Sequence, residues 1–266
     1  MGKKLLLLIC FSTALSFLSF GQDGREEQRQ EELSNGLLMV TWNIQSGDNA
    51  PTLIAEQLRR FRAFDIIALQ EVDEENAPLY TAVFGPGYDA VVSVTGARFN
   101  DHLLFIYNKQ HLRVRRYDEL HAFRGVTITP NITGGGKRSP LILFLTDTRD
   151  NTDFIAITVH FARSDGSQRC LEAFILREWV RSQAEPVIIL GDCNFDYDYL
   201  GEEKGNQSFH IFTFDEQIRW IKPEVLMDTN YSERDGEETY PHSILDFIFA
   251  ARGAETWDIT SRIISR

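Results

Sequence analysis

The sequence contains little cysteine, which limits the ways in which the fold can be held together. Three of the 266 residues are Cys, and Cys10 lies in an apolar stretch near the N-terminus. Cys170 and Cys193 could form at most one bridge, and only in an oxidising compartment. A disulfide framework is therefore excluded, and we favour two free, partly buried thiols in a fold held by its hydrophobic core.

The sequence also lacks an excess of positive charge. It has 27 Lys and Arg against 39 Asp and Glu, a formal net charge of −12. Long nucleic-acid tracts are bound largely through Lys and Arg that neutralise phosphates, so a broad basic binding face is excluded. A phosphate ester is still an acceptable substrate, because carboxylates that hold a divalent cation create positive charge locally.

The apolar run at residues 5–20 is short and is interrupted by three Ser and one Thr. A membrane-spanning helix needs about 20 apolar residues, so a retained anchor fits poorly. Two lysines precede the run and small residues follow it, which is the pattern of a secretory signal peptide. We expect residues 1–21 to be a cleaved signal peptide, the protein to be exported (secreted or periplasmic), and no stable membrane span to remain after cleavage.

After the signal, composition and periodicity predict one α/β domain. Residues 22–35 are polar and charge-dense and are predicted to be a leader, followed by the domain at 36–266. With 43% hydrophobic residues, the chain can bury a large core. A helix is predicted at 51–61, because its apolar residues share one face. Predicted strands lie at residues 37–42, 65–70, 88–94, 103–108, 141–147, 154–161, 186–190 and 244–250.

A second helix is predicted at residues 167–183, with Ser164 or Asp165 as a possible cap. Its apolar residues repeat at helical spacing. The predicted buried face consists of Leu171, Phe174, Ile175 and Trp179.

Polar residues follow several of the predicted strands. Asn43, Glu71 and His160 each come directly after an apolar run, and Asp192 and Asn194 follow another. Each residue alone is typical of an ordinary turn or surface position. Together they indicate a site, because the strand ends of α/β sheets gather ligand-binding groups.

Six short motifs occur in a fixed order along the chain: TWNIQ, LQEV, KRSPL, TVHF, GDCNFD and ILDFIF. This set resembles the endonuclease/exonuclease/phosphatase superfamily, also called deoxyribonuclease I-like, over roughly residues 37–250. GDCNFD and LQEV are the more specific motifs. The resemblance implies a four-layer α/β sandwich, in which two packed mixed β-sheets are flanked by helices and the site lies at one edge.

The resemblance also implies roles for the strand-end residues. Glu71 would be the principal carboxylate ligand of Mg²⁺ or Mn²⁺, with Asn43 beside it. Asn194 would contact the phosphate through its amide, and Asp192 would orient or deprotonate the attacking water. His160 would contact the phosphate or assist the leaving oxygen, although a buried structural histidine is the alternative.

Three further positions match the family less directly. Arg138 resembles a residue that could clamp a phosphate with paired hydrogen bonds, unless it and Lys137 form a solvated basic pair. Thr158 stands where many relatives have Asn, and its hydroxyl can hold the strand-end geometry. Thr239 and Tyr240 match a Thr-aromatic pair that supports the site.

Asp246, in ILDFIF, resembles the aspartate that orients a later histidine in a Ser-Asp-His element, and no Ser-Asp-His occurs in the sequence. We therefore expect the domain to be C-terminally incomplete and to lack the final strand. Three explanations remain open: the sequence is a fragment, His242 substitutes for the lost base, or the protein binds without turnover. His242 is expected at the cleft rim, since it lies only four residues before Asp246.

The sequence thus predicts a metal-dependent phosphodiesterase or nuclease that acts by in-line attack of water. The partner would be a phosphate-ester substrate, including nucleic acid, and we expect a monomer. The alternatives are a phosphate-binding pseudoenzyme, a secreted lipid phosphodiesterase and a phosphomonoesterase. The loop at 125–136 offers few apolar side chains for entering a bilayer, which counts against the lipid enzyme. Arg113, Arg115 and Arg116 could contact nucleic acid, although exposed arginines on a strand usually only solubilise it.

Overall fold

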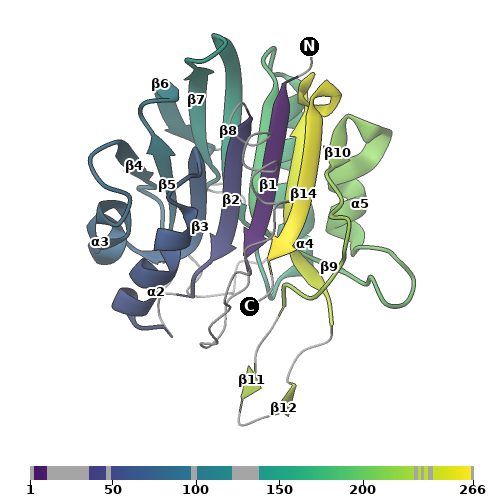
Figure 1. Ribbon diagram of the computed structural model, residues 1–266. Helices are drawn as coiled ribbons and strands as arrows, with labels where there is room; N and C mark the ends of the chain where they lie inside the picture. The colour runs from purple at the N-terminus through teal and green to yellow at the C-terminus, as the bar shows by residue number, and fades with distance from the viewer. Residues whose placement is uncertain are drawn as a thin grey trace, which may run out of the picture.

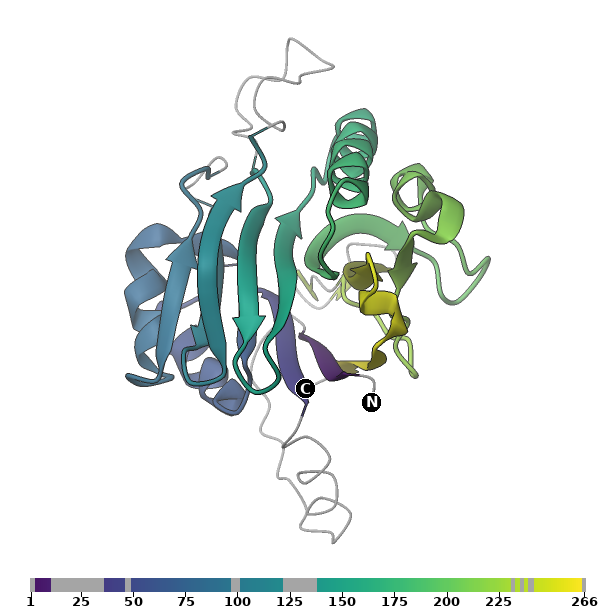
Figure 2. The ribbon, with the colours of Figure 1, turned by 90° about the horizontal axis from the view of Figure 1, so that it is seen from above.

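The computed structural model describes residues 3–10, 36–45, 49–96, 101–121, 138–230, 233–234, 237–238 and 242–264. In these ranges two six-stranded sheets pack face to face, and helices cover both outer faces (Figures 1 and 2). Each sheet contains parallel and antiparallel neighbours. The predicted four-layer sandwich of mixed sheets is therefore confirmed.

The first sheet has the strand order β14-β1-β2-β3-β5-β4. Its strands are β1 (Lys4–Cys10), β2 (Leu37–Asn43), β3 (Ile66–Asp73), β4 (Tyr88–Val92), β5 (Asp101–Asn108) and β14 (Asp258–Ile264). The neighbours from β14 to β3 run parallel, whereas β5 runs antiparallel to both β3 and β4.

The second sheet has the order β10-β13-β9-β8-β7-β6. Its strands are β6 (Leu112–Glu119), β7 (Leu141–Asp147), β8 (Thr152–His160), β9 (Val187–Tyr197), β10 (Ile218–Trp220) and β13 (Ile244–Ala251). Only β8 and β9 pair in parallel, and α4 (Gly166–Arg181) connects them. A two-stranded ribbon, β11 (Glu233–Arg234) and β12 (Glu237–Glu238), lies apart from both sheets.

Side chains alternate between the two faces of each strand, and this alternation builds two layers of core. Leu37 and Met39 of β2 face the second sheet and join the main core, which includes Phe195 and Phe247. Val40 of the same strand faces the opposite way, toward the helices. Central strands such as β2, β7, β9 and β13 are thus buried on both faces, which explains their nearly continuous apolar runs.

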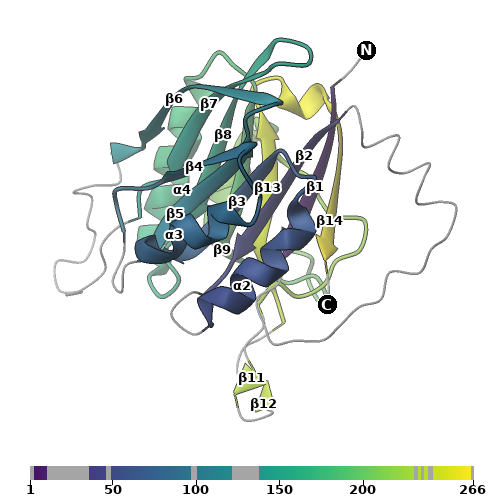
Figure 3. The same cartoon turned by 60° about the vertical axis from the view of Figure 1, so that its left-hand side comes forward.

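Two helices cover the outer face of the first sheet (Figure 3). The helix α2 (Pro51–Leu58) begins with Pro at its first position, where the missing N–H costs no hydrogen bond. It continues into η1 (Arg59–Phe61) and buries Ile54, Leu58 and Phe61, as predicted. The short η2 (Glu74–Asn76) then leads into α3 (Ala77–Ala82).

The second sheet is covered by α4 and α5 (Gln207–Thr213), and η4 (Phe214–Glu216) and η5 (Ala254–Thr256) are single turns. The Asp165 side chain caps α4, as predicted. The predicted buried face of α4 is wrong in part, because Phe174 is 48% exposed. The helix instead buries Ala173, Leu176 and Val180 together with several polar side chains.

The structure places Lys4–Cys10, within the predicted signal peptide, in strand β1 between β2 and β14 (Figure 1). Lys3 precedes this strand, and its ammonium lies 2.9 Å from a carboxylate oxygen of Asp147. Cleavage of residues 1–21 and export stay predictions. The predicted leader at 22–35, Lys137, Thr239 and Tyr240 lie outside the described residues.

Cys170 and Cys193 are both free thiols, in agreement with the expectation from the sequence. None of the helices that the structure describes has the length and apolar character needed to cross a membrane.

Candidate active site

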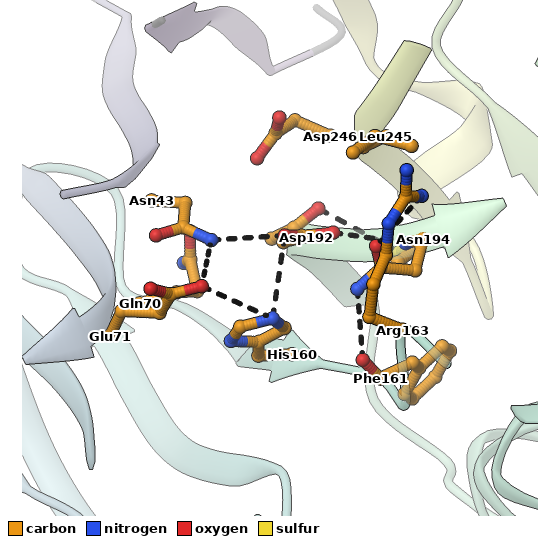
Figure 4. Close-up of polar contacts among 12 residues, drawn as sticks. Asn43, Gln70, Glu71, His160, Phe161, Arg163, Asp192, Asn194, Leu245 and Asp246 are labelled. Atoms are coloured by element: carbon orange, nitrogen blue, oxygen red, sulfur yellow. Dashed lines mark hydrogen bonds and ion pairs between the residues drawn. The ribbon is translucent and has the colours of Figure 1, made fainter. Parts of the chain in front are cut away.

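Four of the predicted site residues meet where strand ends of the two sheets come together (Figure 4). Asn43 ends β2 and Glu71 lies in β3 of the first sheet, while His160 ends β8 and Asp192 lies in β9 of the second. The Asn43 amide donates to Glu71 Oε1 at 2.9 Å and to Asp192 Oδ2 at 3.0 Å. His160 Nε2 lies 3.6 Å from Glu71 Oε1 and 3.4 Å from Asp192 Oδ2.

The donor set of this cluster fits a divalent cation. One ligand atom each from Glu71, His160 and Asp192 lies within 4.8 Å of the others. Carboxylate oxygens are the ligands that Mg²⁺ and Mn²⁺ prefer. The sequence assigned Glu71 and Asn43 to the metal, and the geometry brings Asp192 and His160 to the same place.

The electrostatics of the two carboxylates also favour a cation. Burial, together with the charges of Asp101 and Asp192, raises the pKa of Glu71 to about 7, despite the hydrogen bond from Asn43. Burial raises the pKa of Asp192 to about 6, although it accepts hydrogen bonds from Asn43 and from a backbone N–H. Two partly desolvated carboxylates are costly to ionise together, and a bound cation would remove that cost.

Irregular backbone conformations orient the side chains of Glu71 and Asn194. Glu71 has φ of 57° and Asn194 has φ of 51°, both in the left-handed region, which is unusual for Glu. The pairing of β3 with β5 shifts register between Leu69 and Val72, directly around Glu71. Such bulges re-aim a side chain next to an active site.

Gly191 of the GDCNFD motif allows β8 and β9 to approach closely. A Cβ at this position would lie 2.2 Å from the Val159 carbonyl oxygen, and the residue has φ of +149°. Any side chain would push the two strands apart. The glycine therefore sets the spacing between the strands that carry His160 and Asp192.

A buried polar contact below the site joins the two sheets. Gln70 Nε2 donates to Thr158 Oγ1 at 2.9 Å and to Thr41 Oγ1 at 3.1 Å. All three side chains are fully buried. Thr158 thus supports the strand ends through its hydroxyl, as expected from the sequence.

Asn194 lies beside the cluster and is fixed on several sides. Its backbone N–H donates to Asp192 Oδ1 at 3.0 Å, and its side-chain amide donates to the Phe161 carbonyl at 2.9 Å. Its side-chain oxygen accepts from Arg163 Nη1 at 3.2 Å. Arg163 was not predicted from the sequence, although its position three residues after His160 was a usable signal.

Arg138 reaches the same region, where it forms an ion pair with Asp101. Both side chains are largely buried, at 13% and 17% exposure, so Arg138 is not solvated. Burial, followed by the charges of Arg138 and Arg163, holds the pKa of His160 well below its usual range, and the imidazole is neutral.

Asp101 is the second site residue that the sequence did not reveal. Its Oδ1 lies 4.0 Å from His160 Nδ1, and among the described residues neither atom has a hydrogen-bond partner. Asp101 stands at the start of a strand and belongs to none of the six motifs, so no sequence signal identified it.

Asp246 enters the site from β13, where it is the register partner of Asp192. Burial and the charge of Asp192 raise its pKa well above the usual range. Its Oδ1 is buried and has no hydrogen-bond partner within the part of the chain that the structure describes. The His242 imidazole pairs with Asp228 through its Nδ1.

The fold and these motifs agree with a match to a family model. The chain belongs to the endonuclease/exonuclease/phosphatase family, whose model matches residues 40–263. Among curated proteins, no sequence matches. The family is named for endonucleases, exonucleases and phosphatases, all of which cleave phosphate esters.

Solved structures with the same fold include three informative neighbours. An endonuclease/exonuclease/phosphatase family protein from Bacteroides thetaiotaomicron has a TM-score of 0.58 and 17% identity, covering 86% of this chain and 79% of its own. A B. thetaiotaomicron mannosyl-6-phosphatase has a TM-score of 0.56 and 15% identity, covering 92% and 84%. D. rerio TDP2, complexed with a single-strand DNA product, has a TM-score of 0.60 and 14% identity, covering 80% and 82%. At these identities the likeness concerns the fold alone.

Proposed function

We propose that this protein is a divalent-metal-dependent phosphodiesterase that hydrolyses phosphate esters by in-line attack of water. The observation that carries the proposal is the convergence of Asn43, Glu71, His160 and Asp192 from two different sheets. Packing of a sandwich does not require four polar side chains to meet at one point, and desolvating two carboxylates there costs stability. Such a cluster is expected where chemistry requires it.

Glu71 is the proposed main ligand of Mg²⁺ or Mn²⁺, and Asn43 holds its carboxylate in place. Bound there, the cation would polarise a phosphoryl oxygen and offset negative charge on the phosphate. The Asp192 carboxylate accepts a proton from the attacking water as the water oxygen bonds to phosphorus. The bond between phosphorus and the leaving ester oxygen breaks, and the neutral imidazole of His160 donates a hydrogen bond to that oxygen.

Asn194 and Arg138 are the proposed phosphate contacts. The Asn194 amide can donate one of its two N–H groups to a phosphate oxygen while the other bonds to the Phe161 carbonyl. Arg138 adds positive charge near Glu71 even while it pairs with Asp101. Asp246 is the neighbour of Asp192 on the adjacent strand β13, and its proposed role is to position the group that accepts the proton from water.

A phosphodiester, including nucleic acid, is the proposed substrate class. The DNA product bound to the TDP2 neighbour supports it, and the mannosyl-6-phosphatase neighbour supports phosphomonoesters as the second candidate. We also propose that the protein is exported, on the basis of the signal-like residues 1–21. This would restrict the substrate to esters found outside the cytoplasm.

Hydrolysis of bis(p-nitrophenyl) phosphate with Mg²⁺, Mn²⁺ or EDTA tests the proposal, with p-nitrophenyl phosphate as the monoester comparison. Metal-dependent release of nitrophenolate is expected, and Glu71→Ala or Asp192→Ala should lower kcat by about 10² or more. Glu56→Ala, an exposed change on α2, is the control.

The partner-less oxygen of Asp246 favours a second candidate, a module that binds metal and phosphate without turnover. Absence of hydrolysis on both esters, combined with stabilisation of the chain by metal, would support this candidate and refute the enzyme. If metal neither binds nor stabilises the chain, both candidates fail.

A further inference from the structure

Arg163 differs from the other arginine of the site in its access to solvent. The Arg138 side chain is 13% exposed and pairs with a carboxylate that is itself largely buried. The Arg163 side chain is 39% exposed, although it contacts the buried residue Asn194. Figure 4 shows its guanidinium beside Asn194, on the side of the site opposite Glu71.

The guanidinium of Arg163 is within reach of any ligand that Asn194 touches. Its Nη1 lies 3.2 Å from Asn194 Oδ1 and 2.5 Å from Asp196 Oδ1. A phosphate oxygen bonded to the Asn194 amide would therefore lie close to it. Guanidinium groups bind phosphate through paired, charge-assisted hydrogen bonds.

The segment that carries Arg163 is held rigidly by helix α4. Arg169 Nη1 donates to the carbonyls of Ala162 and Arg163 at 2.7 and 2.8 Å. The Ala162 N–H donates to Glu172 Oε2 at 2.8 Å. Arg169 and Glu172 are both buried, so the backbone of Arg163 is fixed before a ligand arrives.

Asp196, the present carboxylate partner of Arg163, has other donors. Its Oδ2 accepts from Asn206 Nδ2 at 3.2 Å and lies 3.7 Å from Arg169 Nη2. Release of Arg163 would leave the Asp196 carboxylate hydrogen-bonded and near a second guanidinium. If Arg163 exchanges Asp196 for another anion, the Asp196 carboxylate therefore keeps hydrogen-bond donors and a nearby positive charge.

We propose that Arg163 binds substrate: its guanidinium exchanges the Asp196 carboxylate for non-bridging oxygens of the phosphate that is hydrolysed. This inference rests on the proposed function, because it assumes a phosphate at the site. Arg163 then determines affinity for the phosphate group from the side opposite the Glu71 metal ligand. Asp196 competes with substrate for the same guanidinium.

The competition provides a test that separates binding from a structural role. Both measurements use the full chain with saturating Mn²⁺. Calorimetry gives the affinity for inorganic phosphate, and hydrolysis of bis(p-nitrophenyl) phosphate gives KM and kcat. Arg163→Gln should weaken phosphate binding and raise KM by about tenfold. Arg163→Lys should weaken phosphate binding less than Arg163→Gln does, because lysine keeps the positive charge. Asp196→Asn should act in the opposite direction and tighten phosphate binding by about threefold, because it removes the competitor.

Arg181→Gln is the matched control, because Arg181, the last residue of α4, is 37% exposed and also lies near two carboxylates, those of Glu178 and Asp215. It should leave phosphate affinity unchanged. If Arg163→Gln and Asp196→Asn weaken binding alike, or if Arg163→Gln behaves like Arg181→Gln, the inference is wrong. If Arg163→Gln weakens phosphate binding but no variant hydrolyses any ester, the proposed function fails and the phosphate contact stands.

Discussion

The carboxylate of Glu71 should destabilise the metal-free protein at neutral and alkaline pH. Its pKa rises from 4.5 to about 7 in the fold, mainly because the group is buried. Between these pH values the unfolded chain loses a proton that the folded chain keeps. Stability therefore falls as pH rises from about 4.5 to 7, and the full cost is present at pH 8.

The size of the effect follows from the shift. A difference of 2.5 between the two values corresponds to about 3.4 kcal/mol. The Glu71 side chain is 32% exposed, so solvent screening reduces this to about 2 kcal/mol. Glu71→Gln removes the charge but keeps an oxygen that can accept from Asn43. In EDTA it should raise the free energy of unfolding by about 2 kcal/mol at pH 8 and by about 0.5 kcal/mol at pH 5.

Urea unfolding at pH 5, 6, 7 and 8 measures this difference. Saturating Mg²⁺ or Mn²⁺ should stabilise the natural protein at pH 8 and have a much smaller effect on Glu71→Gln. Glu56→Gln removes one exposed charge and should change stability by less than about 0.5 kcal/mol at every pH. If Glu71→Gln is destabilised equally at pH 5 and pH 8, the carboxylate is not under electrostatic strain and the reasoning is refuted.

Three further predictions concern other parts of the fold. Thr158→Val removes an acceptor for the buried Gln70 amide and should cost about 1 to 3 kcal/mol in urea unfolding, whereas Thr158→Ser should cost less. Asp246→Asn should leave neutral-pH stability within about 1 kcal/mol, because burial favours a neutral group there; a large loss would show that its charge is needed. A chain that starts at Gln22 lacks β1, leaves β2 and β14 without the strand between them, and should melt at a lower temperature; an equal Tm would show that β1 contributes nothing.

Most of the fold could be predicted because its signals are local. Most central strands of the sandwich are short apolar runs, and the polar residue at the end of the run marks where the chain leaves the core. The strands β6, β10 and β14 lack such a run and were not among the predicted strands. The helix α2 was predicted for the same reason, since Ile54 and Leu58 recur at helical spacing. The site residues Asn43 and Glu71 were recognisable because they stand at these ends within short motifs.

The sequence was less informative where distant contacts decide the environment. The face of α4 that carries Arg169 and Glu172 is buried because these side chains hold the segment after His160, and the apolar residues of the helix therefore predicted a partly different buried face. Asp101 was not predicted as a site residue because its place in the site depends on its ion pair with Arg138, which is 37 residues away in the sequence. Lys4–Cys10 fits a signal peptide by composition and a strand by its place in the sheet, and composition alone cannot distinguish the two.

The features that make this site costly to fold are also those that would make it reactive. Glu71 stands in a left-handed backbone conformation and is held near Asp192 by Asn43, and burial raises the pKa of both carboxylates. Gly191 lets the strands approach closely enough for His160 to reach both acids. A bound cation would offset the repulsion between the two carboxylates, which would then act as its ligands. Because the fold already holds these side chains together, little rearrangement is needed when the cation binds. Metal should therefore stabilise this chain most at the pH where the metal-free site is least stable.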